Sequence, residues 1–94
     1  MRHKISNFKY GGLTLPMNMK NAIDRYVLHG TNPGNFLTDC LANDLHGACH
    51  SGDLWEITLL PVITTYIYNK TPADCWQSHE AVKNWKGKMN EEAA

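Results

Sequence analysis

Residues 54–70 constrain the fold of this chain more than any other segment. When they are drawn as a helix, apolar side chains occupy more than one face: Leu59, Leu60, Val62, Ile63, Tyr66, Ile67 and Tyr68. A helix that is apolar on several faces is buried on several faces. A chain of 94 residues has few other elements with which to cover it. We therefore expect a second copy of the chain to cover part of this segment, which predicts a homo-oligomer.

The same segment is ambiguous in its secondary structure. Ile57, Leu60, Ile63 and Ile67 fit helical spacing, whereas the content of Ile, Thr, Val and Tyr favours a strand. Pro61 fits poorly in the interior of either. We predict a helix with a kink near Pro61, because the remaining segments are helical and need an apolar partner.

Helical spacing is also clear from Met17 to His29. Gly30 follows at the position of a left-handed C-cap, and Lys20 and Asp24 are spaced to form an ion pair.

Two further helices are predicted downstream. One begins at Thr31 or Asn32, has Pro33 in its first turn and continues to the turn at residues 51–53. The other covers residues 79–85, with Ser78 as its cap.

These elements predict an all-α fold, a compact small domain of three to four helices formed by the whole chain, Met1–Ala94. Residues 1–16 are expected to be an irregular or partly extended arm with a turn at Gly11 and Gly12, and residues 90–94 a frayed end.

Charge and composition exclude several kinds of partner. Nine basic residues balance nine acidic ones, and Asp39 and Asp44 make the second predicted helix acidic, so we expect no DNA partner. Residues 57–69 are too short and too polar to span a membrane. The three cysteines include no CxxC pair, and the N-terminus lacks a signal peptide, which indicates reduced thiols in a cytoplasm.

One group of residues has the spacing of a metal site. His46, Cys49 and His50 lie at positions i, i+3 and i+4, from which two histidines can bind one zinc ion. No glutamate lies between them as in HExxH, and no fourth ligand stands at a recognisable spacing. Surface histidines are the favoured interpretation, so we expect no metal and no cofactor.

Catalysis finds little support in the sequence. Asp39 and Asp44 are five positions apart, which places them off a common helix face. No family signature surrounds any cysteine. We therefore expect no enzyme.

Two residues near the N-terminus suggest a ligand site. Tyr10 lies beside two glycines in a basic arm, where its ring could stack on a nucleobase or instead anchor the arm to the core. Arg25 could hold a phosphate with its guanidinium group, or form an ordinary surface pair with Asp24.

Several blocks of the sequence together resemble a known family. Residues 22–30, 32–38 and 41–45 contain the ordered pattern Arg-Tyr-Val…His-Gly…Pro-Gly-x-Phe-Leu…Asn-Asp-Leu. Tyr-Asn-Lys-Thr-Pro follows at 68–72, with a Ser-His-Glu-Ala-Val helix start at 78–82. This combination resembles the phage anti-CBASS sponge proteins of the second described type, over about two-thirds of the chain.

The resemblance implies a helical subunit that assembles into a homohexamer in the cytoplasm of the infected bacterial host. Proteins of this family sequester cyclic oligonucleotide messengers, including cyclic dinucleotides such as cGAMP and cyclic trinucleotides, without cleaving them. It assigns base stacking to Tyr10, with Gly11 beside it, and phosphate binding to Arg25, although the family usually has lysine there. Lys20 therefore remains an alternative phosphate ligand.

The resemblance also implies a separate site for cyclic trinucleotides, which we place near Thr71 and Pro72. An alternative function is inhibition of a host protein by direct docking. Docking needs an exposed apolar patch of several hundred Å², whereas a sponge needs an aromatic ring and positive charge in one pocket.

Overall fold

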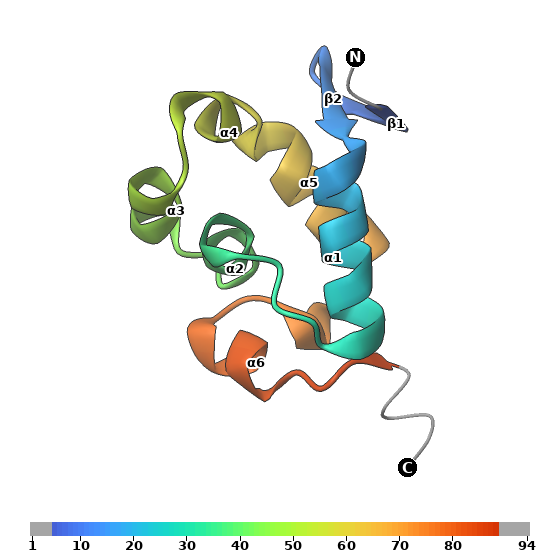
Figure 1. Ribbon diagram of the computed structural model, residues 1–94, viewed down its shortest axis with the longest axis vertical. Helices are drawn as coiled ribbons and strands as arrows, with labels where there is room; N and C mark the ends of the chain where they lie inside the picture. Colours follow the sequence, from blue (N-terminus) through green and yellow to red (C-terminus); the bar gives the residue numbers. More distant parts are fainter. Residues whose placement is uncertain (1–4, 89–94) are drawn as a thin grey trace.

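The computed structural model describes the backbone of residues 5–88 and the side chains from residue 8 onward. This part of the chain forms six α-helices, one short 3-10 helix and one two-stranded sheet (Figure 1). The prediction of a compact, mainly helical domain is confirmed. The predicted number of helices was too low, because two of the four predicted helices are each divided in two. Residues 90–94 lie outside the described residues.

Residues 5–16 form a β-hairpin, so the partly extended alternative is confirmed there and the irregular one was wrong. Strand β1 (Ile5–Tyr10) pairs antiparallel with β2 (Leu13–Pro16). Gly11 and Gly12 form the turn with φ angles of 58° and 79°. Two successive positive φ angles give the turn whose twist matches that of paired strands. The glycine pair therefore closes a hairpin.

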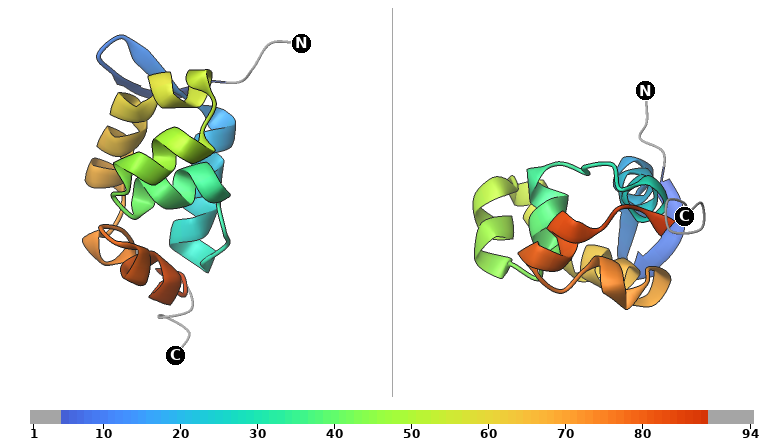
Figure 2. Two further views of the ribbon diagram at one scale, coloured as in Figure 1. Left: turned by 90° about the vertical axis from the view of Figure 1, so that its left-hand side faces the viewer. Right: turned by 90° about the horizontal axis from the view of Figure 1, so that it is seen from below.

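The hairpin packs on the helices beside it (Figure 2). The Phe8 ring meets the ring of Tyr66 edge to face, with centroids 5.1 Å apart. Leu15 of β2 is completely buried. Because β2 leads directly into the first helix, this packing fixes where that helix begins.

Helix α1 (Met17–His29) follows the prediction closely. Gly30 ends it in the left-handed conformation, with φ 74°. Lys20 Nζ lies 2.8 Å from Asp24 Oδ2, which confirms the predicted pair. The Tyr66 hydroxyl also donates to Asp24, across 2.5 Å to Oδ1, and thereby ties α1 to the later helix that carries Tyr66.

The second predicted helix is two helices, α2 (Asn35–Leu41) and α3 (Leu45–Ser51). The predicted start at residues 31–32 was wrong, because Gly34 occupies the N-cap position of α2 with φ 97°. The break comes at Asn43, whose φ is 61°. Asp44 then caps α3 by accepting a hydrogen bond from the backbone N–H of Gly47. Asparagine tolerates the left-handed region and aspartate is a strong cap, so the two residues together divide the helix.

The third predicted helix is divided as well, into α4 (Leu54–Thr58) and α5 (Leu60–Lys70). Asp53 and Glu56 form a reciprocal capping box at the start of α4. Pro61 lies in the first turn of α5, where its missing N–H is not needed. The prediction of a helix rather than a strand is confirmed, and the kink is a complete break.

None of the helices in residues 5–88 has the length and apolarity needed to cross a membrane.

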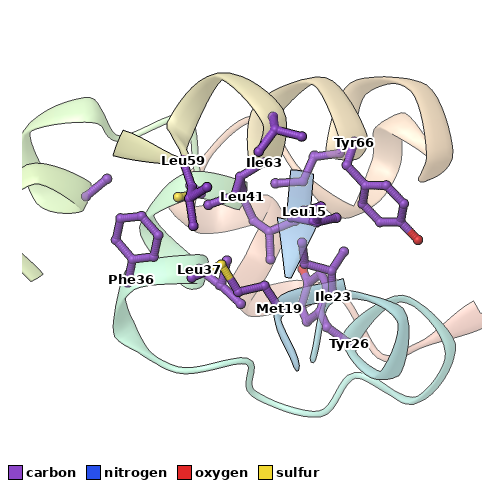
Figure 3. Close-up of a cluster of buried hydrophobic side chains, with 14 of the residues drawn as sticks. Leu15, Met19, Ile23, Tyr26, Phe36, Leu37, Leu41, Leu59, Ile63 and Tyr66 are labelled. Carbon is purple, nitrogen blue, oxygen red and sulfur yellow. The ribbon is translucent and has the colours of Figure 1, made fainter. Parts of the chain in front are cut away.

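The core lies between α1, α2, α5 and β2 (Figure 3). Within α5 the buried side chains are Val62, Ile63, Tyr66 and Ile67. One chain therefore covers these positions by itself, and the premise that α5 needs a partner to cover them was wrong. Tyr68, with 71% of its surface exposed, is the large apolar residue of α5 that remains uncovered.

The C-terminal part is held against α1 through Tyr26. It consists of a 3-10 turn, η1 (Ala73–Cys75), and helix α6 (His79–Asn84), which ends one residue before the predicted end. The Tyr26 hydroxyl donates to the carbonyl of Cys75 across 2.7 Å. The Trp85 indole N–H donates to the carbonyls of Tyr26 and Val27, at 3.0 and 3.1 Å. Burial raises the pKa of Tyr26, so its hydroxyl remains a donor at physiological pH.

Two glycines allow the chain after Trp85 to touch the end of α1. Gly30 and Gly87 have φ angles of 74° and 99°. A Cβ added at Gly87 would lie 2.5 Å from the carbonyl carbon of His29, and one at Gly30 would lie 2.9 Å from that of Lys86. The contact is between two backbone segments, so rotation of a side chain cannot relieve a clash and the backbone itself would have to shift.

Replacing Gly87 with alanine is expected to destabilise the fold more than replacing Gly12. Both residues have a positive φ, which costs alanine about 1–2 kcal/mol. Only Gly87→Ala adds a clash with backbone, which should cost about 1–3 kcal/mol more. The free energy of unfolding from urea titrations measures the difference. Equal losses in the two variants would contradict the close contact.

Candidate functional site

An open cavity of about 410 Å³ lies where the end of β1 meets the outer face of α5. We call it the aromatic cavity, after three of its six lining residues: Tyr10, Tyr68 and Trp76, together with Thr64, Thr65 and Asn69. Its volume is within the range of small-molecule sites, about 300–1,000 Å³. Tyr10 thus lies in the kind of surroundings that base stacking requires.

The aromatic rings of this cavity are accessible. Tyr10 is 52% exposed and Tyr68 is 71% exposed. Tyr68 and Trp76 meet edge to face, with ring centroids 5.9 Å apart. The Trp76 indole nitrogen is shielded from solvent and has no hydrogen-bond partner among the described residues. An unsatisfied buried donor costs about 1–3 kcal/mol, which an acceptor on a ligand could recover.

The polar side chains of the cavity are partly committed to α5 itself. The Thr64 and Thr65 hydroxyls donate to carbonyls one turn earlier, at 2.8 and 2.7 Å. The Asn69 amide nitrogen donates to the Thr65 carbonyl at 3.0 Å. The Asn69 side-chain oxygen is therefore the group best placed to accept a hydrogen bond from a ligand.

The predicted phosphate ligands are not in this cavity. Arg25 is exposed on α1 and does not line it. No ion pair of Arg25 occurs among the described residues, because Asp24 is engaged by Lys20 and Tyr66. Lys20 also lies over the Tyr66 ring, 5.9 Å from its centroid, so it is committed within the subunit. Of the two candidates, Arg25 is the one left available to a ligand.

The other predicted site residues lie in two further places. Gly11 forms the hairpin turn next to Tyr10, and no atom lies within 4 Å of a Cβ added there. The Thr71 hydroxyl donates to the Ile67 carbonyl across 2.6 Å, at the end of α5. Pro72 lines a separate cavity of about 280 Å³ that Lys70 also lines. The structure therefore groups Tyr10 with Gly11, and Thr71 with Pro72, but does not bring the two pairs into one cavity.

The two acidic residues predicted to lie off a common face are close together, so that prediction was wrong. The break at Asn43 turns α3 back so that Asp39, Asp44 and His79 can direct ligand atoms to within 4.8 Å of one another. His79 Nε2 lies 2.8 Å from Asp44 Oδ2 and 3.7 Å from Asp39 Oδ1. Ser51 donates to Asp39 across 2.8 Å. Each acidic group thus has a partner, and the cluster joins α6 to α2 and α3.

The three residues with the spacing of a zinc site do not come together. His46, Cys49 and His50 are exposed on α3, and within residues 5–88 they do not form a cluster of metal-ligating atoms. The other two cysteines are buried. Burial raises the pKa of the Cys40 thiol to about 12, and raises that of Cys75 as well. Neither buried thiol is an activated nucleophile, since activation requires a lowered pKa.

A cavity of about 590 Å³ lies between the end of α1 and helix α6. Lys83, Lys86, His29 and His79 contribute to its lining. We call it the basic cleft. The sequence analysis did not identify it, because its walls come from segments about 50 residues apart that Tyr26, Trp85 and the two glycines bring together.

Sequence reasoning also missed Tyr68 and Trp76 as partners of Tyr10. Tyr68 was counted with the apolar residues of its helix. The spacing of Tyr68 could have indicated its place in the aromatic cavity. It lies four positions after Thr64, one helical turn along the same face, and both residues line the cavity. No local pattern pointed to Trp76.

The His79 contact predicts a specific pH dependence for Asp44. The hydrogen bond from His79 is the largest cause of the lowered pKa of Asp44, and the charge of His46 is the smallest. A lowered folded-state pKa stabilises the protein above the ordinary value, about 3.9, and the contribution disappears as the pH falls through the lowered value. His79→Ala should therefore raise the Asp44 pKa toward about 3.9, and His46→Ala should change it less. Carboxyl carbon shifts followed by NMR across acid pH measure both, and a larger effect of His46→Ala would contradict the assignment.

Comparison with known proteins gave no match to this chain among protein-family models, curated proteins or solved structures.

Proposed function

We propose that this protein binds cyclic oligonucleotide second messengers and sequesters them without cleavage, thereby blocking CBASS-type antiphage signalling in the cytoplasm of an infected bacterium. The ligands are cyclic dinucleotides such as cGAMP, and cyclic trinucleotides. The aromatic cavity is the observation that carries this proposal. It combines an accessible tyrosine at the end of a hairpin with a second exposed tyrosine and an unpartnered indole N–H.

Nucleobases fit the chemistry of this cavity. A base presents a π-face to Tyr10 or Tyr68, and stacking of this kind is worth about 1–3 kcal/mol per base. It also carries ring nitrogens or carbonyl oxygens that can accept from Trp76, and amino groups that can donate to Asn69. Because stacking requires only a π-face, such a site tolerates different bases, which suits a protein that binds several messengers.

The phosphates need positive charge that the aromatic cavity does not itself contain. We propose that Arg25 from a second subunit supplies it. Arg25 is exposed and has no ion pair among the described residues, whereas Lys20 is bound to Asp24. A guanidinium group binds phosphate oxygens in a bidentate manner, so two Arg25 side chains match the two phosphates of a cyclic dinucleotide.

Subunit contacts are expected at exposed apolar side chains of α3 and α4, in a homo-oligomer that we propose to be a hexamer. Leu45, Leu54 and Trp55 are 67%, 81% and 52% exposed. The same three residues support the second candidate function, in which the surface docks on a host protein. The two differ in the state of the isolated protein, since only the first requires self-association.

We place the proposed trinucleotide site at the cavity beside Pro72. Lys70 and Lys88 also line that cavity and supply positive charge for phosphates, whereas Asp24 on its wall is already paired with Lys20.

Purified protein is expected to bind cyclic dinucleotides in a calorimetric titration and to release them unchanged after heat denaturation. Chromatography of the released ligand distinguishes sequestration from hydrolysis. Linear products whose amount increases with protein concentration would contradict sequestration and indicate a nuclease. No binding of any cyclic dinucleotide or trinucleotide, together with a monomeric mass, would favour the docking function.

Substitutions at Tyr10 and Arg25 are expected to weaken binding of cyclic dinucleotides in different ways. Tyr10→Ala removes the stacking ring and should cost about 1–3 kcal/mol, whereas Tyr10→Phe retains the ring and should cost much less. Arg25→Glu should abolish binding, and Arg25→Lys should weaken it by removing the bidentate contact. Light scattering shows whether each variant keeps the mass of the parent protein.

Mixing the two defective variants tests whether the site lies between subunits. If Tyr10 and Arg25 come from different chains, refolding Tyr10→Ala together with Arg25→Glu creates some sites with both residues intact, and part of the binding returns. If both residues act within one chain, every site in the mixture lacks one of them and no high-affinity binding returns. Normal binding by both single variants would show that the site lies elsewhere.

A further inference from the structure

The basic cleft is larger than the aromatic cavity and is formed by different residues. Its walls are the end of α1, the loop before α2, and the segment from α6 to Lys86. Figure 2 shows α6 far from the hairpin that carries Tyr10. The cleft therefore cannot be an extension of the site proposed for cyclic dinucleotides in the same subunit.

Among residues 5–88 no carboxylate lines the cleft, and its titratable side chains are bases apart from Tyr26, whose hydroxyl is bonded to the Cys75 carbonyl. Lys83, Lys86, His29 and His79 all contribute to its wall. Asp39 and Asp44 lie beyond His79 and are paired with it, and the exposed Glu80 on α6 does not line the cleft. The lysines therefore dominate the charge inside.

Neutral groups in the lining are also suited to donate hydrogen bonds. The side-chain oxygen of Asn32 accepts from the Gly34 N–H at 2.7 Å, which leaves its amide N–H groups available. Thr38 contributes a hydroxyl to the same wall. Ammonium, amide and hydroxyl donors around one cavity favour an anion with several oxygen atoms.

The wall that carries Lys86 is held in place before any ligand binds. The Trp85 indole is bonded to two carbonyls at the end of α1. Gly30 and Gly87 bring the backbone at the end of α1 into contact with the backbone of Lys86 and Gly87. Little ordering of the backbone is then needed on binding, which lowers the entropic cost of association.

We propose that the basic cleft binds a phosphate monoester of a small organic molecule. At neutral pH a phosphate monoester carries a charge of about −1.5 to −2, which is favoured beside the exposed Lys83 ammonium in the wall of the cleft. The volume of about 590 Å³ leaves room for an organic group beside the phosphate. This site acts independently of Tyr10.

Ribose 5-phosphate is the probe that tests the proposal, because it has the phosphate ester but no base to stack on Tyr10. The protein has three tryptophans, so labelling with 5-fluorotryptophan gives three fluorine signals. Trp55→Phe and Trp76→Phe assign two signals, and the third belongs to Trp85. Ribose 5-phosphate is expected to shift the Trp85 signal in a saturable manner and to leave that of Trp76 in place.

Charge reversal identifies the ligand-binding side chains. Lys83→Glu is expected to raise the apparent Kd for ribose 5-phosphate at least tenfold, whereas Lys9→Glu, the same change on the hairpin outside the cleft, is expected to leave it within about twofold. Ribose without phosphate should give no shift, and the apparent affinity should fall as salt is added.

Three outcomes would overturn the proposal. The first is no saturable shift of the Trp85 signal at millimolar ribose 5-phosphate. The second is an unchanged apparent Kd for ribose 5-phosphate in Lys83→Glu. The third is a Trp85 signal that ribose shifts as much as ribose 5-phosphate does. None of these results bears on binding of cyclic dinucleotides at Tyr10, which the calorimetric titrations test separately.

Discussion

The hydrogen bonds at Tyr26 hold together parts of the chain that are distant in sequence. Its hydroxyl bonds to Cys75, and its carbonyl accepts from both Gly30 and Trp85. The Gln77 N–H bond to the Leu41 carbonyl, the Trp85 N–H bond to the Val27 carbonyl and the ion pairs of His79 also hold the segment after α5 to the helices. Buried hydrogen bonds of this kind contribute about 1 kcal/mol each, and an orphaned partner costs more. Together with Trp85 and the two glycines, Tyr26 brings α6 to the end of α1 and so forms the basic cleft.

The sequence predicted the bounds of a helix well where the residues of that segment alone determine them. Helix α1 has regular apolar spacing and a glycine at its end, and its predicted bounds agree with the observed ones. The break at Leu59 has no side-chain cap and is marked instead by Pro61 in the first turn of α5. The break at Asn43 was harder to predict, since a residue with tolerable helix propensity leaves the helix only when a good cap follows. At Asn43 that cap is Asp44. The signal was therefore a pair of residues, and neither member is decisive alone.

The hairpin illustrates a different limit. Gly11 and Gly12 were identified as a turn, but strand pairing also requires a surface on which one face of the hairpin can be buried. That surface is α5, through the contact of Phe8 with Tyr66. The same tertiary contact carries Tyr10 to Tyr68 and Trp76. The choice of Tyr10 as a candidate could be made from the sequence, whereas its neighbours depend on packing between segments more than 50 positions apart.

Helices α3 and α4 contribute very little to the core. Helix α4 has no buried residue and α3 has only Ala48, so local caps at Asp44 and Asp53 hold this region more than packing does. Segments with few buried contacts open in fluctuations that leave the rest of the protein folded. Amide protons from Leu45 to Thr58 should therefore exchange with solvent through subglobal opening, ahead of those in α1 and α5. A protein surface that docks on this region must first suppress such opening, so part of its binding energy is spent in completing the fold.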